Sequence, residues 1–360
     1  MPSLVEEVDH ALAQRPRVVV RPVSLAERVV FVGGQPGCGK TMITPILSSF
    51  ARVEIQKYHY MLEHLCDLCF LGKVQDDVAI TVIRMLVDID VYNLAMARET
   101  NFRFSDLSSV FKNPGTWRYL RRLFLPGDAE AVERIRHEHP ILQLTIHNVL
   151  AISRPLFKAL GERMRILEVV RHPLYMVEQW YRYMDRYGTD VRDFAVCFDY
   201  QGHTLPFFAC GWEERYVRSS TMDRVIYAIE RLSEWGDQAF QNLSEGERAQ
   251  VMVVSFERFV LDPWPAMKEL ERFLGTSMTP ATRRELKRQR VPRKMVAEGV
   301  PLPIYKQYGW KPPEEGADER RELDRRRQFA ADRATAEAMA VLDQLSEKYE
   351  STYLHAQPVG

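Results

Sequence analysis

One stretch constrains the fold of this chain more than any other: residues 28–49, which read RVVFVGGQPGCGKTMITPILSS. Residues 29–32 are β-branched and aromatic, which is typical of a buried strand. Residues 34–41 then match the spacing G-x-x-x-x-G-K-T without a mismatch, and a mainly apolar segment follows, as a helix would. Glycines let backbone N–H groups turn toward phosphate oxygens, and the start of a helix carries a partial positive charge. The order of strand, glycine loop and helix therefore predicts a site for phosphate or sulfate.

The composition indicates a globular protein without general affinity for large anionic partners, and it leaves room for a local basic cleft. The chain has 360 residues, 46% of them apolar, with 49 basic and 49 acidic side chains. This length provides a large core in one α/β domain or two smaller ones. Zero net charge argues against general affinity for nucleic acid or for an anionic membrane. The N-terminus lacks a signal-peptide pattern and no apolar run reaches membrane-spanning length, so we expect a soluble cytoplasmic protein of undetermined oligomeric state.

The five cysteines do not form the pattern of a disulfide framework or of a zinc site. Their number is odd, and the chain is long. Cys66 and Cys69 form a C-x-x-C with His59 and His64 nearby, but no second pair of cysteines follows at a zinc-site spacing. Because free cysteine is often buried, we expect a buried helix face here and no metal.

The rest of the pattern alternates short apolar strands with longer helices, which predicts an α/β fold with a parallel sheet. We expect further strands at residues 53–55, 141–150, 166–170 and 251–255, and helices at residues 151–163, 223–240, 265–274 and 318–349 and through 179–183. We expect a short helix and a β-rich segment within residues 1–27, an ordered loop at 196–222 and a turn at 256–262. The predicted architecture is a three-layer, P-loop-like parallel sheet flanked by helices, in a single domain of residues 1–360. Residues 59–140 form a helical insertion, and residues 283–360 form a basic segment and a C-terminal helix.

Two side chains with useful chemistry follow predicted strands. Arg171 stands at the carboxyl end of the strand at 166–170, and ligands of open α/β sheets bind at that edge. Its guanidinium is a planar, permanently charged fork suited to phosphate, although a surface arginine at a strand end would look the same. His147 follows the strand that begins at residue 141, where it could be a general base or a hydrogen-bonded loop histidine.

Four motifs in this order resemble the sulfotransferases that use 3′-phosphoadenosine 5′-phosphosulfate (PAPS). They are Pro36-Gly-Cys-Gly-Lys-Thr41 after the first strand, Val170-Arg-His-Pro173 at the end of a later strand, Phe256-Glu-Arg-Phe followed by Asp262-Pro, and Phe273-Leu-Gly275 at the end of a helix. The order and rough spacing agree over residues 28–275. The resemblance implies that PAPS is the donor, that 3′-phosphoadenosine 5′-phosphate (PAP) is the product, and that no metal is needed.

The resemblance also implies a set of donor-binding residues. They are Gly37, Cys38, Gly39, Lys40, Thr41, Met42, Arg171, Gln179, Arg293 and Lys294. The chain departs from the family pattern at three of them. Gly37 stands where the family has Lys or Arg, Lys40 where it has Thr or Ser, and Gln179 where it has a Ser that binds the 3′-phosphate. Arg293 and Lys294 resemble a late basic loop without its glycine, and a solvated basic face explains them equally well.

The resemblance implies a transfer of the sulfuryl group to an acceptor hydroxyl. Lys40 and His147 are the candidate catalytic residues, with Lys40 at the transferring end of the donor and His147 as the base. Many members of the family act on carbohydrates, so we expect a carbohydrate or glycoconjugate acceptor. Aromatic residues between 200 and 216 could stack on such a ring or belong to the core: Tyr200, Phe207, Phe208, Trp212 and Tyr216.

Two alternatives remain. One is a nucleoside-triphosphate-dependent kinase or NTPase, which the intact GKT supports and which would need a magnesium-binding acid such as Asp88 or Asp90. The apolar spacing of residues 78–96 instead predicts a helix with exposed acids. The other alternative is a nucleotide-binding regulatory or scaffold protein without catalysis.

Overall fold

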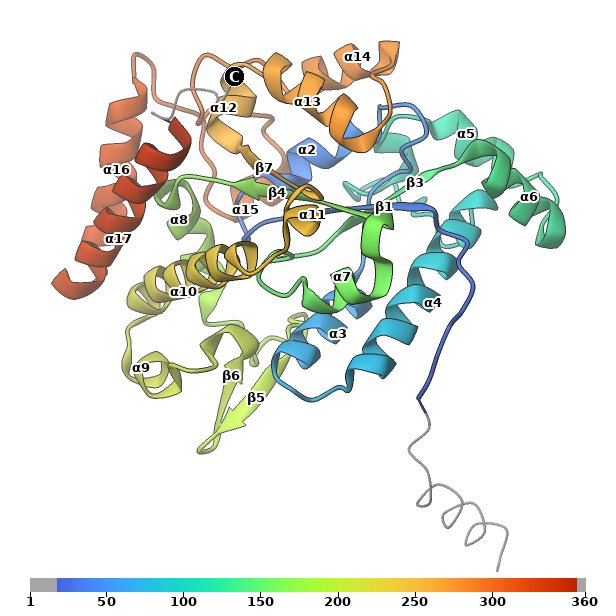
Figure 1. Ribbon diagram of the computed structural model, residues 1–360. Helices are drawn as coiled ribbons and strands as arrows, with labels where there is room; N and C mark the ends of the chain where they lie inside the picture. Colours follow the sequence, from blue (N-terminus) through green and yellow to red (C-terminus); the bar gives the residue numbers. More distant parts are fainter. Residues whose placement is uncertain (1–17, 355–360) are drawn as a thin grey trace, which may run out of the picture.

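Five parallel strands form the central sheet of the protein, in a computed structural model that describes residues 18–354 (Figure 1). In spatial order they are β2 (Lys57–Tyr58), β3 (Ile141–Thr145), β1 (Arg28–Gly33), β4 (Met164–Val170) and β7 (Val251–Ser255). All four pairings are parallel. Helices cover both faces, so the predicted three-layer α/β fold with a P-loop-like parallel sheet is confirmed.

The order of the strands fixes where a ligand can bind. Every residue of β3 and all but the first of β1 are buried, as expected for inner strands of a parallel sheet. β1 has β3 on one side and β4 on its other side. The chain therefore leaves β1 at the point where the strand order reverses, which is where open α/β sheets bind their ligands.

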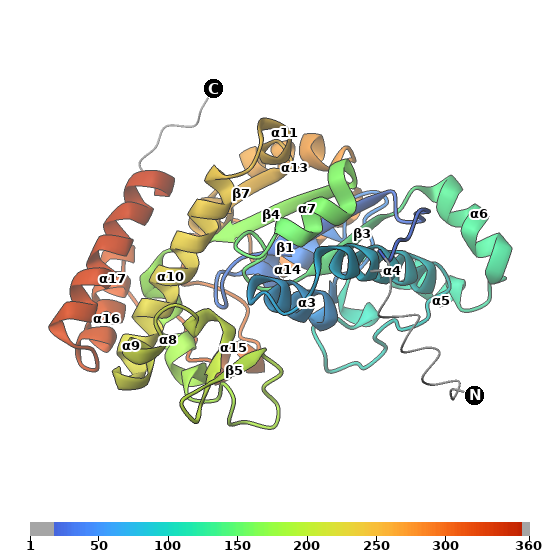
Figure 2. The same cartoon turned by 60° about the horizontal axis from the view of Figure 1, so that its bottom comes forward.

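Helices form the two outer layers, one on each face of the sheet. In Figure 2 the face at the bottom of Figure 1 is turned toward the viewer. One face carries α2 (Lys40–Leu47), α13 (Trp264–Leu274) and α14 (Pro280–Arg288), and the opposite face carries α3 (Tyr60–Phe70), α4 (Asp76–Ala95), α7 (Arg154–Leu160) and α10 (Thr221–Gln241). The pair α16 (Glu319–Ala331) and α17 (Ala336–Tyr349) packs against α8 (Pro173–Met184). The remaining helices are α5 (Thr116–Arg122), α6 (Asp128–Glu138), α9 (Glu213–Arg218), α11 (Glu245–Arg248), α12 (Phe256–Leu261) and α15 (Pro303–Gln307), with short turns η1 (Val110–Lys112), η2 (Gly161–Arg163), η3 (Phe207–Ala209) and η4 (Glu350–Leu354).

The second predicted strand lies later in the chain than expected. Within residues 53–55, Val53 alone pairs with the sheet, through an isolated bridge to Ile141. The backbone N–H of Glu54 donates to the carbonyl of Ile141 at 2.9 Å in this bridge, while the N–H of Ile55 donates to the hydroxyl of Tyr119 at 2.8 Å. Regular pairing resumes only in β2, so the prediction for residues 53–55 was wrong.

Two segments predicted as loop or turn contain regular structure. Residues 196–222 include an antiparallel hairpin of β5 (Cys197–Tyr200) and β6 (His203–Pro206), together with η3 and α9. Its two turn residues, Gln201 and Gly202, have φ angles of 52° and 83°, as a type I′ hairpin turn requires. The expected turn at residues 256–262 is helix α12, which Ser255 caps by accepting from the N–H of Arg258.

The helix predicted over Asp88 and Asp90 is present as α4, but the two acids are buried rather than exposed. Asp88 accepts hydrogen bonds from the backbone N–H groups of Leu25 and Ala26, at 2.8 and 2.9 Å. Asp90 forms an ion pair with Lys57 at 2.5 Å. Both carboxylates therefore hold neighbouring segments of the chain, which explains why charged groups are tolerated inside.

Some of the remaining predictions concern residues outside 18–354, or properties that the structure does not test. The short N-terminal helix falls mostly in residues 1–17, outside the described residues, and residues 18–23 form no strand. In the part that the structure describes, no helix combines the length and the apolar character needed to cross a membrane. Cys66 is buried in α3 and Cys69 is half-buried, both as free thiols. The single-domain assignment and the cytoplasmic location stay predictions.

Candidate active site

A cavity of about 260 Å³ lies at the edge of the sheet where the parallel strands end. Its lining includes the loop after β1, His147 shortly after β3, Arg171 directly after β4 and Phe256 directly after β7. The carboxyl ends of four strands therefore deliver side chains to one place, as the parallel topology requires. The cavity holds the two side chains that the sequence analysis selected at strand ends.

The loop between β1 and α2 has the backbone shape of a phosphate-binding turn. Gly37 and Gly39 have φ angles of 87° and 99°, in the left-handed region. A Cβ atom on Gly39 would lie 2.2 Å from the ring of Phe256, so only glycine fits there. Lys40 begins α2, and its ammonium donates to two carbonyl oxygens of the loop at 3.2 Å each. The start of a helix and a buried lysine thus face the same cavity.

Three arginines gather elsewhere in the lining: Arg171, Arg293 and Arg326. The guanidinium of Arg171 lies 4.2 Å from the ring centre of Phe256, and that of Arg293 lies 5.5 Å from the same ring. Arg171 and Arg326 also share Tyr175, at 4.9 and 4.3 Å from its ring centre. The aromatic rings hold these cations close together through cation–π contacts.

In this arginine cluster, defined as Arg171, Arg293 and Arg326, Arg326 forms an ion pair with Glu322 at 2.7 Å, whereas Arg171 and Arg293 form none with the residues that the structure describes. Burial lowers the pKa of Arg171, and the charge of Arg326 lowers it further against the opposing effect of Glu257. Burial and the charge of Arg171 together lower the pKa of Arg293 to about 10. Arg171 donates from Nη1 to the Gly37 carbonyl at 2.9 Å, but its buried Nε has no partner among the described residues. An anion in the cavity would relieve the repulsion and satisfy this donor.

His147 is paired with a carboxylate that no sequence motif indicated. Its Nδ1 lies 3.1 and 3.2 Å from the two carboxyl oxygens of Glu63, and its backbone N–H donates to the same carboxylate at 2.7 Å. Burial raises the pKa of Glu63, but the charge and hydrogen bonds of His147 outweigh this and hold the pKa below its usual value. An ionised Glu63 requires the proton of a neutral His147 to sit on Nδ1, which leaves Nε2 free to accept a proton.

A second cavity of about 420 Å³ adjoins the first. The two cavities share six lining residues, which are Pro36, Tyr58, His147, Gln179, Ile304 and Tyr308. His147 therefore lies at the boundary, with the phosphate loop on one side and the second cavity on the other side. This arrangement suits a base that acts between a donor and an acceptor.

Most of the predicted donor-binding residues line the first cavity. They are Gly37, Gly39, Lys40, Thr41, Met42, Arg171, Gln179 and Arg293. Gln179 lies against the loop, since a Cβ atom on Gly37 would be 3.1 Å from its Oε1. Cys38 instead points its buried thiol toward the carbonyl of Gly33 and lines a different cavity. Lys294 is exposed and outside the lining, so it is not part of the candidate site.

The aromatic residues divide between the second cavity and the core. Phe207 and Phe208 line the second cavity. Trp212 and Tyr216 are buried, and they contact each other's rings at 5.2 Å rather than facing a cavity. Tyr200 lies in β5, packed against the core and outside both cavities. Only the first two are therefore placed to contact an acceptor.

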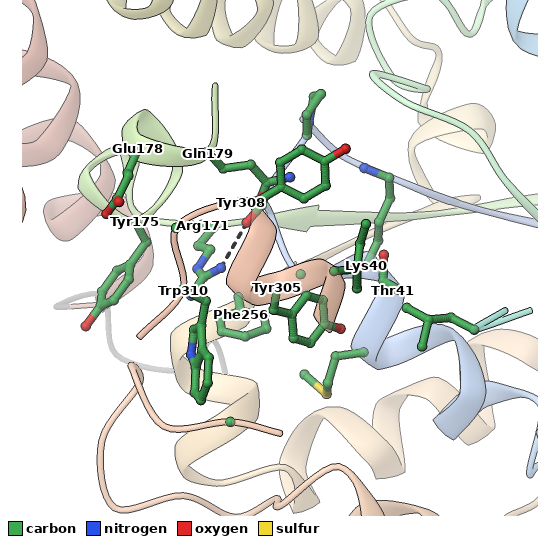
Figure 3. Close-up of a pocket in the computed structure, with 18 of the residues that line it drawn as sticks. Lys40, Thr41, Arg171, Tyr175, Glu178, Gln179, Phe256, Tyr305, Tyr308 and Trp310 are labelled. Atoms are coloured by element: carbon green, nitrogen blue, oxygen red, sulfur yellow. Dashed lines mark hydrogen bonds between the residues drawn. The ribbon is translucent and has the colours of Figure 1, made fainter. Parts of the chain in front are cut away.

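Several lining residues were missed because they come from distant segments. They are Glu63 on α3, Tyr175 and Glu178 on α8, Phe256 on α12, Arg326 on α16, and Tyr305, Tyr308 and Trp310 around α15. Figure 3 shows the aromatic rings of Tyr305, Tyr308 and Trp310 around Arg171, with Lys40 and Thr41 to one side and Tyr175 to the opposite side. The only usable signal was Ser255-Phe256 at a strand end, where a ligand-facing residue is expected.

The fold and the site define an α/β protein with a phosphate loop and a separate arginine cluster in one cavity. No family model matches the chain, and no curated protein matches it. Matches among solved structures include the sulfotransferase domain from the curacin biosynthetic pathway, with 10% identity, 89% of this chain and 98% of that chain covered, and a TM-score of 0.44. A sulfotransferase from Mycobacterium avium has 14% identity, 97% and 81% coverage, and a TM-score of 0.41. A mouse sulfotransferase complexed with PAP has 11% identity, 92% and 86% coverage, and a TM-score of 0.36. Sequence identities of 10–14% and TM-scores of 0.36–0.44 are too low to carry a function, so the function must follow from the residues that line the cavity.

Proposed function

We propose that the protein is a sulfotransferase that uses PAPS as donor and an acceptor hydroxyl as second substrate. The observation that carries this proposal is that two groups of anion-binding character line one cavity, the glycine loop with Lys40 and the arginine cluster. PAPS has anionic groups at two ends, a 5′-phosphosulfate and a 3′-phosphate. A nucleoside triphosphate has one chain of phosphates and no 3′-phosphate, so it offers no second anionic group to Arg171 and Arg293.

The residues present fit this donor. We assign the loop N–H groups and Lys40 to the 5′-phosphosulfate. We assign Arg171, whose Nε has no partner among the described residues, and Arg293 to the 3′-phosphate, because both line the cavity. The rings of Tyr305 and Trp310 line the same cavity and offer faces on which adenine can stack.

When bound, the donor supplies a sulfuryl group, which the acceptor oxygen receives while the bond from sulfur to the phosphate oxygen breaks. His147 accepts the proton of the acceptor hydroxyl at Nε2. Glu63 holds the imidazole in the required tautomer and stabilises the imidazolium that forms. Lys40 offsets the negative charge that develops on the phosphate oxygen.

A carbohydrate or glycoconjugate hydroxyl remains the proposed acceptor, and the second cavity supports it. Aromatic rings line this cavity, including Tyr60, Phe207 and Phe208, and such faces stack on flat or ring-shaped molecules. His147 opens to both cavities, so an acceptor hydroxyl in the second cavity would lie beside the base.

The kinase alternative loses its acid candidates. Asp88 and Asp90 lie on α4, outside the lining of both cavities, and each is occupied by contacts within the fold. The hydroxyl of Thr41, which a P-loop kinase would direct at magnesium, lies 3.0 Å from the hydroxyl of Tyr58. The paired His147 and Glu63 favour a catalytic role over a purely regulatory one.

We expect PAP to raise the melting temperature of the full chain in the absence of metal, and ATP to do so less. A ligand at a hundred times its Kd stabilises the folded state by about 2.7 kcal/mol, which is easily measured by differential scanning fluorimetry. The same experiment with ATP and Mg²⁺ is the comparison. Strong stabilisation by ATP with Mg²⁺ and none by PAP would refute the proposed donor.

A further inference from the structure

The second cavity contains a buried carboxyl that the proposed chemistry does not use. Asp67 lies on α3, one helical turn after Glu63, and lines this cavity while only 2% exposed. Its Oδ1 has no hydrogen-bond partner among residues 18–354. Burial, reinforced by the charge of Glu63, raises the pKa of Asp67 to about 8. Buried acceptors are almost always satisfied, so an unpaired one on a residue that lines a cavity points to a ligand that donates.

The surroundings of Asp67 favour a cation over a neutral donor. Among the cavity's lining residues the only Lys or Arg is the exposed Arg192, whereas three are carboxylic acids. Asp193 is occupied by the N–H groups of Gly188 and Ala195, and Glu63 by His147, so Asp67 is the one unpaired acid of the three, while His64 Nδ1 and Asn148 Oδ1 in the same lining also lack a partner among the described residues.

Aromatic rings complete this environment. The lining includes Tyr60, Tyr183, Tyr187, Phe194, Phe207 and Phe208. Several are in mutual contact, with ring centres 5.0 Å apart for Tyr187 and Phe208. Aromatic faces beside a carboxylate are the usual surroundings of a bound ammonium group, because the ring face is negative.

We propose that the acceptor carries an ammonium group that Asp67 binds, while its hydroxyl reaches His147. This inference rests on the proposed sulfotransferase function and narrows its acceptor hydroxyl to compounds that carry an ammonium group; amino sugars stay within the proposed carbohydrate class, and phenolic amines would replace it. Binding of the ammonium ionises Asp67, and the displaced proton leaves to solvent. Asp67 is then the residue that decides acceptor specificity, separate from the donor site.

The test compares matched probes that differ only in the amine. Tyramine is paired with 4-ethylphenol and glucosamine with glucose, and each is titrated calorimetrically into the full chain with and without PAP. We expect at least one ammonium probe to bind about tenfold or more tightly than its neutral partner, the factor typical of a charge-assisted hydrogen bond. Asp67→Asn should remove this preference and leave the neutral probe within about threefold. Asp199→Asn, which removes an exposed carboxylate outside the cavity lining, should keep the preference.

The outcomes separate this inference from the proposed function. Equal binding within both pairs, no binding of any probe, or an unchanged preference in a folded Asp67→Asn variant would each overturn the role of Asp67. The variant's melting temperature checks that it folds, and Asp67→Ser provides a second replacement that also lacks the charge. Titration of PAP alone reports on the donor site. If PAP does not bind, the result counts against the proposed sulfotransferase function and not against the role of Asp67 in the second cavity.

Discussion

Replacing His147 with alanine is expected to lower turnover by about 100-fold or more while PAP binds as before. The acceptor hydroxyl must lose its proton as its oxygen bonds to sulfur, and His147 is the imidazole at the boundary of the two cavities. Its Nδ1 is held by Glu63, so Nε2 is the nitrogen free to accept. The measurement is steady-state turnover with a saturating acceptor, alongside calorimetric titration of PAP.

Two further variants show whether this effect belongs to the base. Glu63→Gln keeps the shape of the partner but removes its charge, and it should cause a smaller fall in turnover with a shifted pH profile. His203→Ala removes an exposed histidine at the start of β6 and should leave turnover unchanged. Near-native turnover of His147→Ala would show that His147 is structural and that the base is a different group.

Lys40→Met should lower kcat by about 100-fold or more, because a positioned cation at the developing charge is worth roughly that factor. Methionine keeps most of the length of the buried side chain, so the loss of charge is the main change. The ammonium donates to two carbonyl oxygens of the loop, which places it beside any group that the loop binds. The readout is kcat, with KM for the donor measured in the same experiment.

Lys40→Arg serves as the matched control, since it restores the charge with a different shape. It should recover part of the lost kcat. A fall in donor affinity without a fall in kcat would mean that Lys40 binds the ground state only, which would contradict its assignment to the transferring end.

Four of the five strands of the sheet, and the positions of residues that follow them, could be predicted from the sequence. Parallel strands end at one edge, so residues that directly follow them must be neighbours. This rule predicted, without any knowledge of helix packing, that Lys40, His147 and Arg171 lie close together, and all three line one cavity. The glycine spacing predicted the loop, because the positive φ angles at Gly37 and Gly39 suit few other residues.

The missed residues depend on contacts between elements far apart in the chain. Arg326 stands in the run Arg325-Arg-Arg327, and only the packing of α16 against α8 makes it the buried member. Glu63 reaches His147 across 84 residues of sequence. Asp88 and Asp90 were misplaced at the surface because their partners come from outside α4. No local pattern encodes such pairings, whereas the Ser255 cap of α12 was a local signal that could have been used.

The most direct test of the sulfotransferase assignment is calorimetric titration of the wild-type chain and Arg171→Ala with PAP and with adenosine 5′-phosphosulfate, which lacks the 3′-phosphate. A lost charge-assisted contact costs on the order of 1.5–3 kcal/mol. Wild type should therefore bind PAP, and Arg171→Ala should weaken PAP by about tenfold or more while changing the affinity for adenosine 5′-phosphosulfate much less. Equal weakening of both ligands would show that Arg171 does not read the 3′-phosphate, and the assignment would then rest on a loop that kinases share.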